Sequence, residues 1–185
     1  MTIEQAINRA QVLETGHFIF ADGDHATLKL EMDHLWEHPA ELATVLAALA
    51  RADGLPPADV ILGAPTGGQR LAEAVAELTG LPLARLERVP GGAKQDFRFV
   101  SAADRQLALA ARSPRIYEDV VTTLSSVAGV VKLLEPRRQA VRSLAVWRRG
   151  QVKPAYRAGL ADHYLVEQPI LSLPPDECQV CHPRA

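Results

Sequence analysis

In the first quarter of the chain, two segments carry apolar residues at helical spacing. In the segment between them, apolar and polar residues alternate. Residues 3–10 place Ile and Ala on one helical face, which predicts a short N-terminal helix. Residues 16–21 and 26–32 are extended runs around an Asp-Gly turn at Gly23, the pattern of a β-hairpin. Residues 38–49 begin with His-Pro and carry Leu and Val at i, i+3, i+4 and i+7, which predicts a second helix.

The middle of the chain has the pattern of a strand, a loop, a helix and a returning strand. Residues 60–62 are a short apolar run, typical of a strand buried on both faces. Small residues at 63–68 form a loop, and apolar residues at 71–78 predict a helix that stops at Gly80. Residues 81–86 are expected to return as a strand. A strand that returns after a helix predicts parallel pairing.

A long segment, residues 88–113, interrupts this alternation. Residues 97–100 have the pattern of a locally paired strand, and residues 104–111 that of a helix. A connection of this length within a compact domain is typical of a functional flap or of a disordered loop.

The second half of the chain returns to alternating strands and helices. Strands are expected at 115–121, 141–147 and 164–166, with a helix at 127–134. This order predicts an α/β fold, a mostly parallel twisted sheet flanked by helices, as one domain over residues 1–185. Ligands in such sheets bind beyond the carboxyl ends of the strands.

Composition and charge narrow the classes of function. The 185 residues are 48% hydrophobic and 23% charged, and 20 basic against 22 acidic side chains give a net charge of −2. A general nucleic-acid binder needs a basic surplus, so nucleic acid is not an expected partner. The chain has no apolar run near the ~20 residues that span a bilayer and no recognisable signal peptide, so a cytoplasmic location is expected.

The stretch 117–126 carries the most informative chemistry. Glu118 and Asp119 stand where a strand is expected to end, and two threonines and two serines lead from there into the next helix. Hydroxyls and backbone N–H groups at a helix N-terminus bind phosphate, and adjacent carboxylates suit a ribose diol or a hydrated Mg²⁺. A sugar phosphate satisfies both halves. The alternative is a Ser/Thr helix cap beside two solvated acids.

This stretch resembles the motif that binds phosphoribosyl pyrophosphate (PRPP) in type I phosphoribosyltransferases, in which two acids follow an apolar strand and precede a phosphate loop. The small-residue loop 63–68 is similar to the pyrophosphate loop of that family, and Gly67 and Gly68 would let backbone N–H groups approach an anion.

The N-terminal residues resemble the orotate members of the family. Gly16-His17-Phe18, Gly23 and His25, followed by Asp33, Leu35 and His38-Pro39, have the spacing found there. The resemblance implies that residues 1–40 and the C-terminal tail form a hood over the base. It also implies a homodimer, with the flap of one subunit reaching the site of the other.

The resemblance implies that orotate displaces pyrophosphate from PRPP, with Mg²⁺ carried by PRPP rather than by protein ligands. The catalytic residues would be Glu118, Asp119 and Lys94. Residues implied in substrate binding fall into four groups: for the 5-phosphate Thr122, Thr123, Ser125 and Ser126; for pyrophosphate Thr66, Gly67, Gly68 and Arg88; for the orotate carboxylate Arg148; and in the hood Lys29.

Leu124 departs from the family pattern, which has glycine at this place in the phosphate loop. A leucine is strained wherever the backbone needs a positive φ. The hood also has Glu31-Met32 in place of Asn-Lys, and Lys29 would replace that cation only in part. An alternative is therefore a catalytically degenerate homologue that binds PRPP or nucleotides, and another is a phosphoribosyltransferase for a different base.

Cysteine and histidine gather near the two ends of the chain. Cys178 and Cys181 form a Cys-x-x-Cys pair that also resembles the C-terminus of some family members. We interpret the pair as two plain thiols or a structural metal half-site across a dimer, in preference to a haem attachment site. Among the histidines at 17, 25, 34 and 38 we expect packing and capping roles, with a metal site as the alternative.

Overall fold

The structure is a computed structural model that describes residues 1–20, 23–135, 140–157 and 160–182. Its contacts divide the chain into two compact units. The larger unit is Val45–Glu167, and the smaller unit combines Met1–Thr44 with Gln168–Ala185. Helix α3 (Pro39–Arg51) runs through the division and confirms the helix expected after His38.

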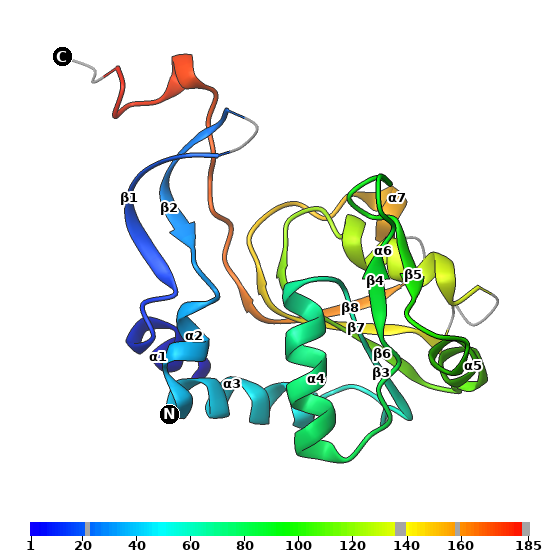
Figure 1. The fold of residues 1–185 in the computed structure, drawn as a ribbon. Coiled ribbons are helices and arrows are strands. Elements are labelled where there is room, and N and C mark those ends of the chain that lie inside the picture. Colours follow the sequence, from blue (N-terminus) through cyan, green and yellow to red (C-terminus); the bar gives the residue numbers. More distant parts are fainter. Residues whose placement is uncertain (21–22, 136–139, 158–159, 183–185) are drawn as a thin grey trace. The chain divides into compact units, whose positions relative to one another are not determined.

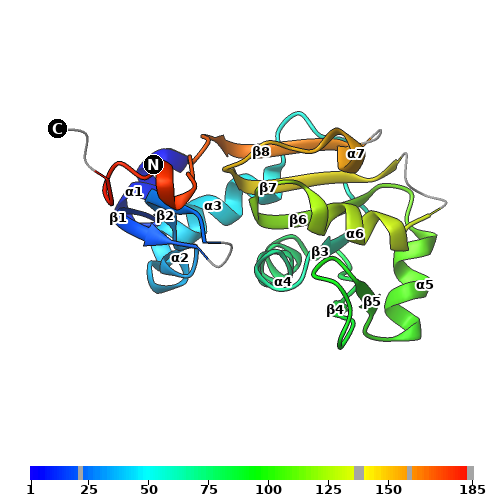
Figure 2. The ribbon, with the colours of Figure 1, turned by 90° about the horizontal axis from the view of Figure 1, so that it is seen from above.

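A four-stranded parallel sheet forms the centre of the larger unit. Its order is β3 (Val60–Gly63), β6 (Pro114–Val121), β7 (Arg142–Arg148) and β8 (Ala161–Glu167), as Figures 1 and 2 show. The predicted α/β class is confirmed. Every residue of β3 is buried, as expected of a strand covered on both faces.

Helices and a hairpin complete the larger unit. They are α4 (Gly67–Thr79), the hairpin of β4 (Leu86–Arg88) and β5 (Phe97–Phe99), α5 (Ala102–Ala110), α6 (Ser125–Leu133) and α7 (Pro154–Arg157). Helix α4 packs on β3 and β6, while the hairpin packs against α5 and α6. Helix α4 ends at Gly80, whose φ of 70° is the left-handed conformation that terminates many helices.

The strand expected at 81–86 is wrong. Only an isolated parallel bridge joins Leu83 to Ile61, and the strand that forms is β4, which pairs with β5 in antiparallel fashion. The carbonyl of Pro82 accepts from the N–H of Ile61 at 2.8 Å. The Ala84 N–H donates in turn to the Ile61 carbonyl at 2.9 Å, and these two bonds form the bridge at Leu83. Pro82 has no N–H, so the parallel pairing cannot extend back toward Leu81. The local pairing of 97–100 and the helix over 104–111 are confirmed by β5 and α5.

The smaller unit contains the predicted N-terminal helix and hairpin. Helix α1 (Ile3–Arg9) starts with a capping box between Thr2 and Gln5. Strands β1 (Leu13–Ile19) and β2 (His25–Leu30) pair in antiparallel fashion, followed by α2 (His34–Glu37). Gly23 has a φ of 89°, while Asp22 of the expected turn lies outside the described residues.

The C-terminal tail belongs to the smaller unit. Leu173 and His25 exchange two backbone hydrogen bonds of 2.8 Å, so the tail pairs with the start of β2 before it turns through the 3₁₀ helix η2 (Pro175–Glu177).

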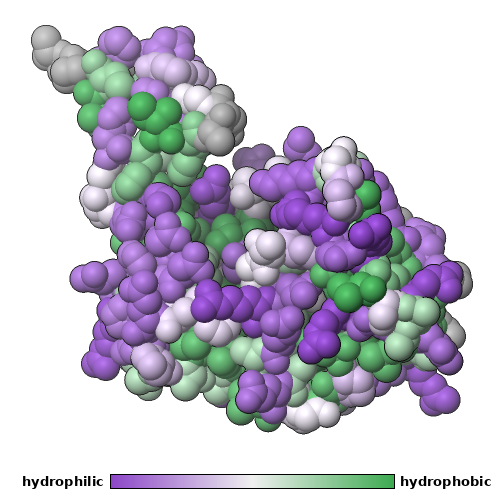
Figure 3. Space-filling view, in the orientation of Figure 1, coloured by the Kyte–Doolittle hydropathy of each residue, from purple (hydrophilic) through white to green (hydrophobic). Residues whose placement is uncertain are grey.

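The apolar residues predicted for the buried face of α4 divide: Leu71 and Val75 are buried, but Leu78 is 57% exposed. One hydrophobic cluster of the larger unit includes Val60, Leu62, Ile116, Val130 and Leu134. On the face shown in Figure 3, hydrophilic side chains predominate over the larger unit, with hydrophobic ones scattered among them. Within the part of the chain that the structure describes, no helix has the length and apolar character needed to cross a membrane.

Candidate functional site

A small pocket lies at the carboxyl end of β6. It has a volume of about 100 Å³ and is lined by Glu118, by residues 120–127 and by Lys94 from the β4–β5 loop. Sites for whole small molecules are typically ~300–1,000 Å³, so this pocket has room for only part of such a molecule. It brings together several residues that the sequence predicts for the site: Lys94, Glu118, Thr122, Thr123, Ser125 and Ser126.

The floor of the pocket is a turn with a left-handed residue at its centre. Leu124 has φ 73° and ψ 9°, directly before α6 begins at Ser125. A positive φ favours glycine, which is the residue that the family pattern has at this position. In this chain the position is a leucine. Its side chain is 3% exposed and packs in the core of the larger unit with Val127 and Val130. Burial of the side chain compensates for the unfavourable backbone.

Helix α6 presents its N-terminus to this turn. Leu124 makes no side-chain cap, so the N–H groups of the first turn of α6 are left for another acceptor. The Thr123 hydroxyl donates to Ser125 Oγ at 3.1 Å. Hydroxyls and N–H groups at the positive end of a helix dipole are donors suited to an anion.

The segment that follows β7 forms hydrogen bonds with the turn at residues 122–123. Arg149 Nε donates to Thr122 Oγ1 at 3.2 Å, and the Lys153 N–H donates to the Thr123 carbonyl at 3.2 Å. A Cβ on Gly150 would lie 2.6 Å from the Thr122 carbonyl oxygen, so only glycine permits this approach. The sequence analysis missed Arg149; its place two residues after the predicted strand end at 147 was the available signal.

The two acids occupy different environments. Glu118 is 7% exposed, and its Oε2 has no hydrogen-bond partner among the described residues. Burial, reinforced by the hydrogen bond with Asp119 and its charge, raises the pKa of Glu118 well above 4.5. Asp119 Oδ1 accepts from the Val120 N–H at 2.7 Å, and its Oδ2 lies where a Cβ on Gly67 would be only 1.9 Å away.

The loop between β3 and α4 lies directly against β6. The Pro65–Thr66 peptide bond is cis, and Thr66 is exposed. A Cβ on Gly68 would lie 2.4 Å from the Tyr117 carbonyl oxygen. The glycines at 67 and 68 therefore have a structural reason that the sequence analysis did not give: they let α4 begin in contact with the end of β6.

Arg88 ties this loop to the β4–β5 loop. One guanidinium nitrogen donates to the Pro65 carbonyl at 2.8 Å, and another donates to the Lys94 carbonyl. The guanidinium carbon also lies 5.6 Å from the centre of the Phe97 ring, a cation–π contact. Arg88 thus helps to place Lys94 beside the pocket.

Arg148 does not line the pocket. It is the last residue of β7, beside Val121 in the sheet register. Its Nη2 lies 2.5 Å from Glu167 Oε2, and its guanidinium carbon lies 5.3 Å from the centre of the Tyr164 ring. The planar guanidinium is thus held against an aromatic face by a carboxylate.

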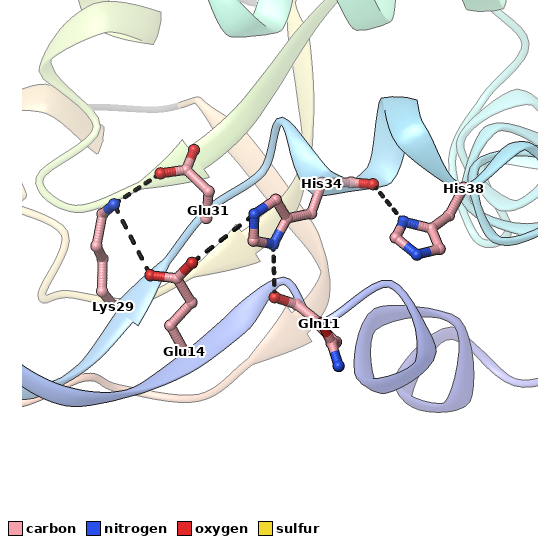
Figure 4. Close-up of polar contacts among 6 residues, drawn as sticks. All are labelled: Gln11, Glu14, Lys29, Glu31, His34 and His38. Atoms are coloured by element: carbon pink, nitrogen blue, oxygen red, sulfur yellow. Dashed lines mark hydrogen bonds and ion pairs between the residues drawn. The ribbon is translucent and has the colours of Figure 1, made fainter.

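Lys29 belongs to a polar network of the smaller unit (Figure 4). Its ammonium lies 2.7 Å from Glu31 and 3.9 Å from Glu14. The hydrogen bond with Glu31 raises the pKa of Lys29 and lowers that of Glu31. His34 extends the network through Glu14 at 3.7 Å, and its Nδ1 contacts the Gln11 carbonyl at 2.9 Å. His34 and His38 therefore have the local bonding roles expected of them; the Nδ1 of His38 contacts the His34 carbonyl at 2.8 Å.

Comparison with known proteins agrees with the resemblance to phosphoribosyltransferases. The chain is 29% identical over 154 residues to an orotate phosphoribosyltransferase of Wolinella succinogenes, an alignment that covers 81% of this chain and 71% of that protein. No family model matches the chain.

Solved structures share the fold at lower identity. An orotate phosphoribosyltransferase from Aeropyrum pernix superposes with a TM-score of 0.67 at 17% identity, covering 90% of this chain and 94% of that one. The adenine enzyme from Giardia lamblia, complexed with 9-deazaadenine, gives 0.66 at 12% identity over 91% and 98% of the two chains. The chain therefore shares its fold with solved phosphoribosyltransferase structures, in agreement with the resemblance found in the sequence.

Proposed function

We propose, on the type I phosphoribosyltransferase fold that this chain shares, that it transfers the 5-phosphoribosyl group of PRPP to a nitrogenous base, orotate, in pyrimidine nucleotide synthesis. A ring nitrogen of orotate attacks C1 of the ribose, and the bond from C1 to pyrophosphate breaks. The observation that carries the proposal is the pocket after β6, in which Glu118, the hydroxyl-rich turn and Lys94 meet.

The turn is the proposed seat of the 5-phosphate. The first N–H groups of α6 and the hydroxyls of Thr122, Thr123, Ser125 and Ser126 supply donors, and Lys94 supplies positive charge. These groups lie on a helix start and a short turn braced by the segment after β7. Such fixed donors orient the sugar with little reorganisation.

The two acids are proposed to bind the ribose hydroxyls and to stabilise positive charge on the ring in an oxocarbenium-like transition state. Asp119 would act as a carboxylate near the ring. Glu118 is buried with an unpartnered oxygen, which a ribose hydroxyl would satisfy. Developing positive charge beside Glu118 would favour its ionised form, so its stabilising effect would grow as the transition state forms.

Pyrophosphate is proposed to leave toward the loop at 65–68. Thr66 offers an exposed hydroxyl, Gly67 and Gly68 start α4, and Arg88 lies against the Pro65 carbonyl. The Asp119 carboxylate, which lies against Gly67, fits a nearby hydrated Mg²⁺, because carboxylate oxygens suit this ion. Mg²⁺ carried by PRPP would neutralise part of the charge on the leaving group.

Arg148 and Lys29 are the proposed contacts for orotate. Arg148 already holds the Glu167 carboxylate, so the orotate carboxylate would replace a similar partner. Lys29 would act from the hood formed by residues 1–40 and the tail.

The direct test follows orotate by its absorbance in the presence of PRPP and Mg²⁺. Asp119→Asn should reduce the rate by at least about a hundredfold, since it removes a charge near the reacting carbon. The control is Asp53→Asn, because Asp53 is a surface residue with an 81% exposed side chain. Absence of turnover by the unaltered chain with orotate or any other nucleobase would reject transferase activity.

Leu124 favours a second candidate function, a homologue that binds PRPP or nucleotides without turning them over. A leucine with a left-handed backbone occupies the position in the phosphate turn where the family pattern has glycine. PRPP binding with no product from any base would establish this second function.

The proposal extends to assembly and location. We propose a homodimer, which sedimentation velocity would detect as twice the 20.1 kDa chain mass. The proposed cytoplasmic location is tested by cell fractionation.

A further inference from the structure

We propose that the smaller unit contains a structural Zn²⁺ site formed by His17, His25, Cys178 and Cys181. The site lies entirely within one chain, and it is independent of the proposed transferase activity. It replaces our interpretation of the two cysteines as plain thiols or as half of a site shared between subunits.

The four ligand atoms converge on one point. All lie within 4.8 Å of one another. His17 Nε2 is 3.1 Å from His25 Nδ1, and the Cys181 sulfur is 3.3 Å from the same His25 nitrogen. The His17 nitrogen also lies 3.4 Å from the Cys178 sulfur and 3.6 Å from the Cys181 sulfur.

These separations fit tetrahedral zinc. Zn–N bonds of ~2.0–2.1 Å and Zn–S bonds of ~2.3 Å at tetrahedral angles place neighbouring ligand atoms about 3.3–3.8 Å apart. Four of the separations, 3.1–3.6 Å, are close to this range, and all stay within 4.8 Å, before any ion draws the ligands together. Two cysteines and two histidines are also a common ligand set of structural zinc sites, and four protein ligands leave no open position for catalysis.

The fold explains why residues 161 positions apart in the sequence meet. His25 pairs with Ile19 across the hairpin, and His17 stands two residues before Ile19, so both imidazoles lie on one face. The register of β1 shifts by one residue between Thr15 and Phe18, so that His17 lies within a bulge of the strand. The tail reaches this face because Leu173 is bonded to His25.

The turn of the tail brings the two sulfurs together. After η2, the His182 N–H donates to the Cys178 carbonyl at 2.9 Å, which closes a turn through Gln179 and Val180. Cys178 is 5% exposed and His25 is 9% exposed, so half of the ligand set is buried. Both cysteines are free thiols, as metal binding requires.

The inferred role is to fasten the tail to the hairpin. A small unit has a small hydrophobic core, and structural zinc is one of the usual additions that stabilise such units. Because binding requires the folded arrangement, zinc should stabilise the pairing of Leu173 with β2.

The test uses the full chain purified with reductant. Metal analysis should find one Zn²⁺ per chain, and replacement by Co²⁺ should give the visible bands of tetrahedral cobalt together with thiolate charge transfer. Cys181→Ser and His25→Ala should each lower the zinc affinity at least tenfold, whereas His182→Ala, a neighbouring histidine outside the cluster, should leave it unchanged.

Three results would overturn the proposal. One is a reduced chain that binds neither Zn²⁺ nor Co²⁺. Another is binding that survives the removal of both histidines, at half an ion per chain, because this indicates a site shared through the cysteines alone. The third is a chain purified without reductant that has no metal and a Cys178–Cys181 disulfide. None of these readouts depends on transferase activity.

Discussion

Leu124 lines the proposed phosphate seat and has a backbone conformation that leucine rarely adopts. Its φ of 73° costs roughly 1–2 kcal/mol for a residue with a Cβ. The buried side chain offsets this cost. The sequence raised the question of strain at this position, but only the structure supplies the sign of φ.

Two substitutions at Leu124 separate backbone strain from side-chain packing. Both Leu124→Ala and Leu124→Gly should destabilise the chain by about 2–5 kcal/mol, because both remove a buried side chain. Glycine should nevertheless be more stable than alanine by about 1 kcal/mol, since only glycine has no penalty at positive φ. Urea unfolding measures the difference.

Leu71 provides the matched control. It is also buried but lies inside α4, where alanine should be about 1 kcal/mol more stable than glycine. The same order at Leu124 as at Leu71 would contradict the left-handed turn.

Glu118 should make stability fall as pH rises. Its pKa in the folded chain is raised well above 4.5 by burial, so the folded chain holds a proton that the unfolded chain releases. Below pH 4.5 both states are protonated and there is no penalty. The penalty then grows until the pH passes the raised pKa.

Glu118→Gln removes this penalty, so it should raise Tm at pH 8 by ~2–4 °C for each kcal/mol recovered and leave Tm at pH 4 nearly unchanged. Thermal unfolding across this pH range checks the result. The exposed Glu77→Gln on α4 serves as the control. An equal Tm for Glu118→Gln and the unaltered chain at pH 8 would show that Glu118 is not desolvated.

At the scale of elements, the contact between the start of α4 and the end of β6 positions the proposed site. Gly68→Ala would bring a Cβ to 2.4 Å from the Tyr117 carbonyl oxygen, within rigid backbone. We expect a loss of about 1–3 kcal/mol in unfolding free energy and a strong loss of activity, because the loop at 65–68 must shift.

Gly54→Ala is the comparison for that substitution. Gly54 has a φ of 79° and open space around its Cβ position, so it tests backbone strain alone and should keep activity. If Gly68→Ala retained full activity and stability, the proposed close packing of α4 on β6 would be wrong.

The sequence predicted elements where periodicity or turn chemistry is local. Strand β3 is a short apolar run, and α4 stops at the glycine that the sequence marks as its end. The strand predicted at 81–86 was wrong, because the apolar pattern there does not reveal that parallel pairing is limited to the bridge at Leu83 and that β4 pairs with β5 instead. The burial of Glu118 also depends on packing that no local pattern contains.

At the scale of the whole molecule, the pocket after β6 and the proposed zinc cluster each join residues that are far apart in the sequence but belong to one unit. Lys94 meets the turn at 122–126 in the larger unit, and the zinc ligands meet in the smaller one. The residues of the turn could be predicted from their resemblance to a family motif. The grouping of His17 with the cysteines required the structure, because the sequence does not specify how the tail pairs with β2.

Equilibrium titration of the full chain with PRPP and Mg²⁺ tests the central claim, that the turn after β6 is a phosphate seat. The account predicts one binding event per chain, weakened at least about tenfold by Lys94→Ala, because a charge-assisted contact is lost. Lys132→Ala removes an exposed lysine at the other end of α6 and should bind as the unaltered chain does. Failure of the unaltered chain to bind PRPP, or equal weakening by both lysine variants, would contradict it.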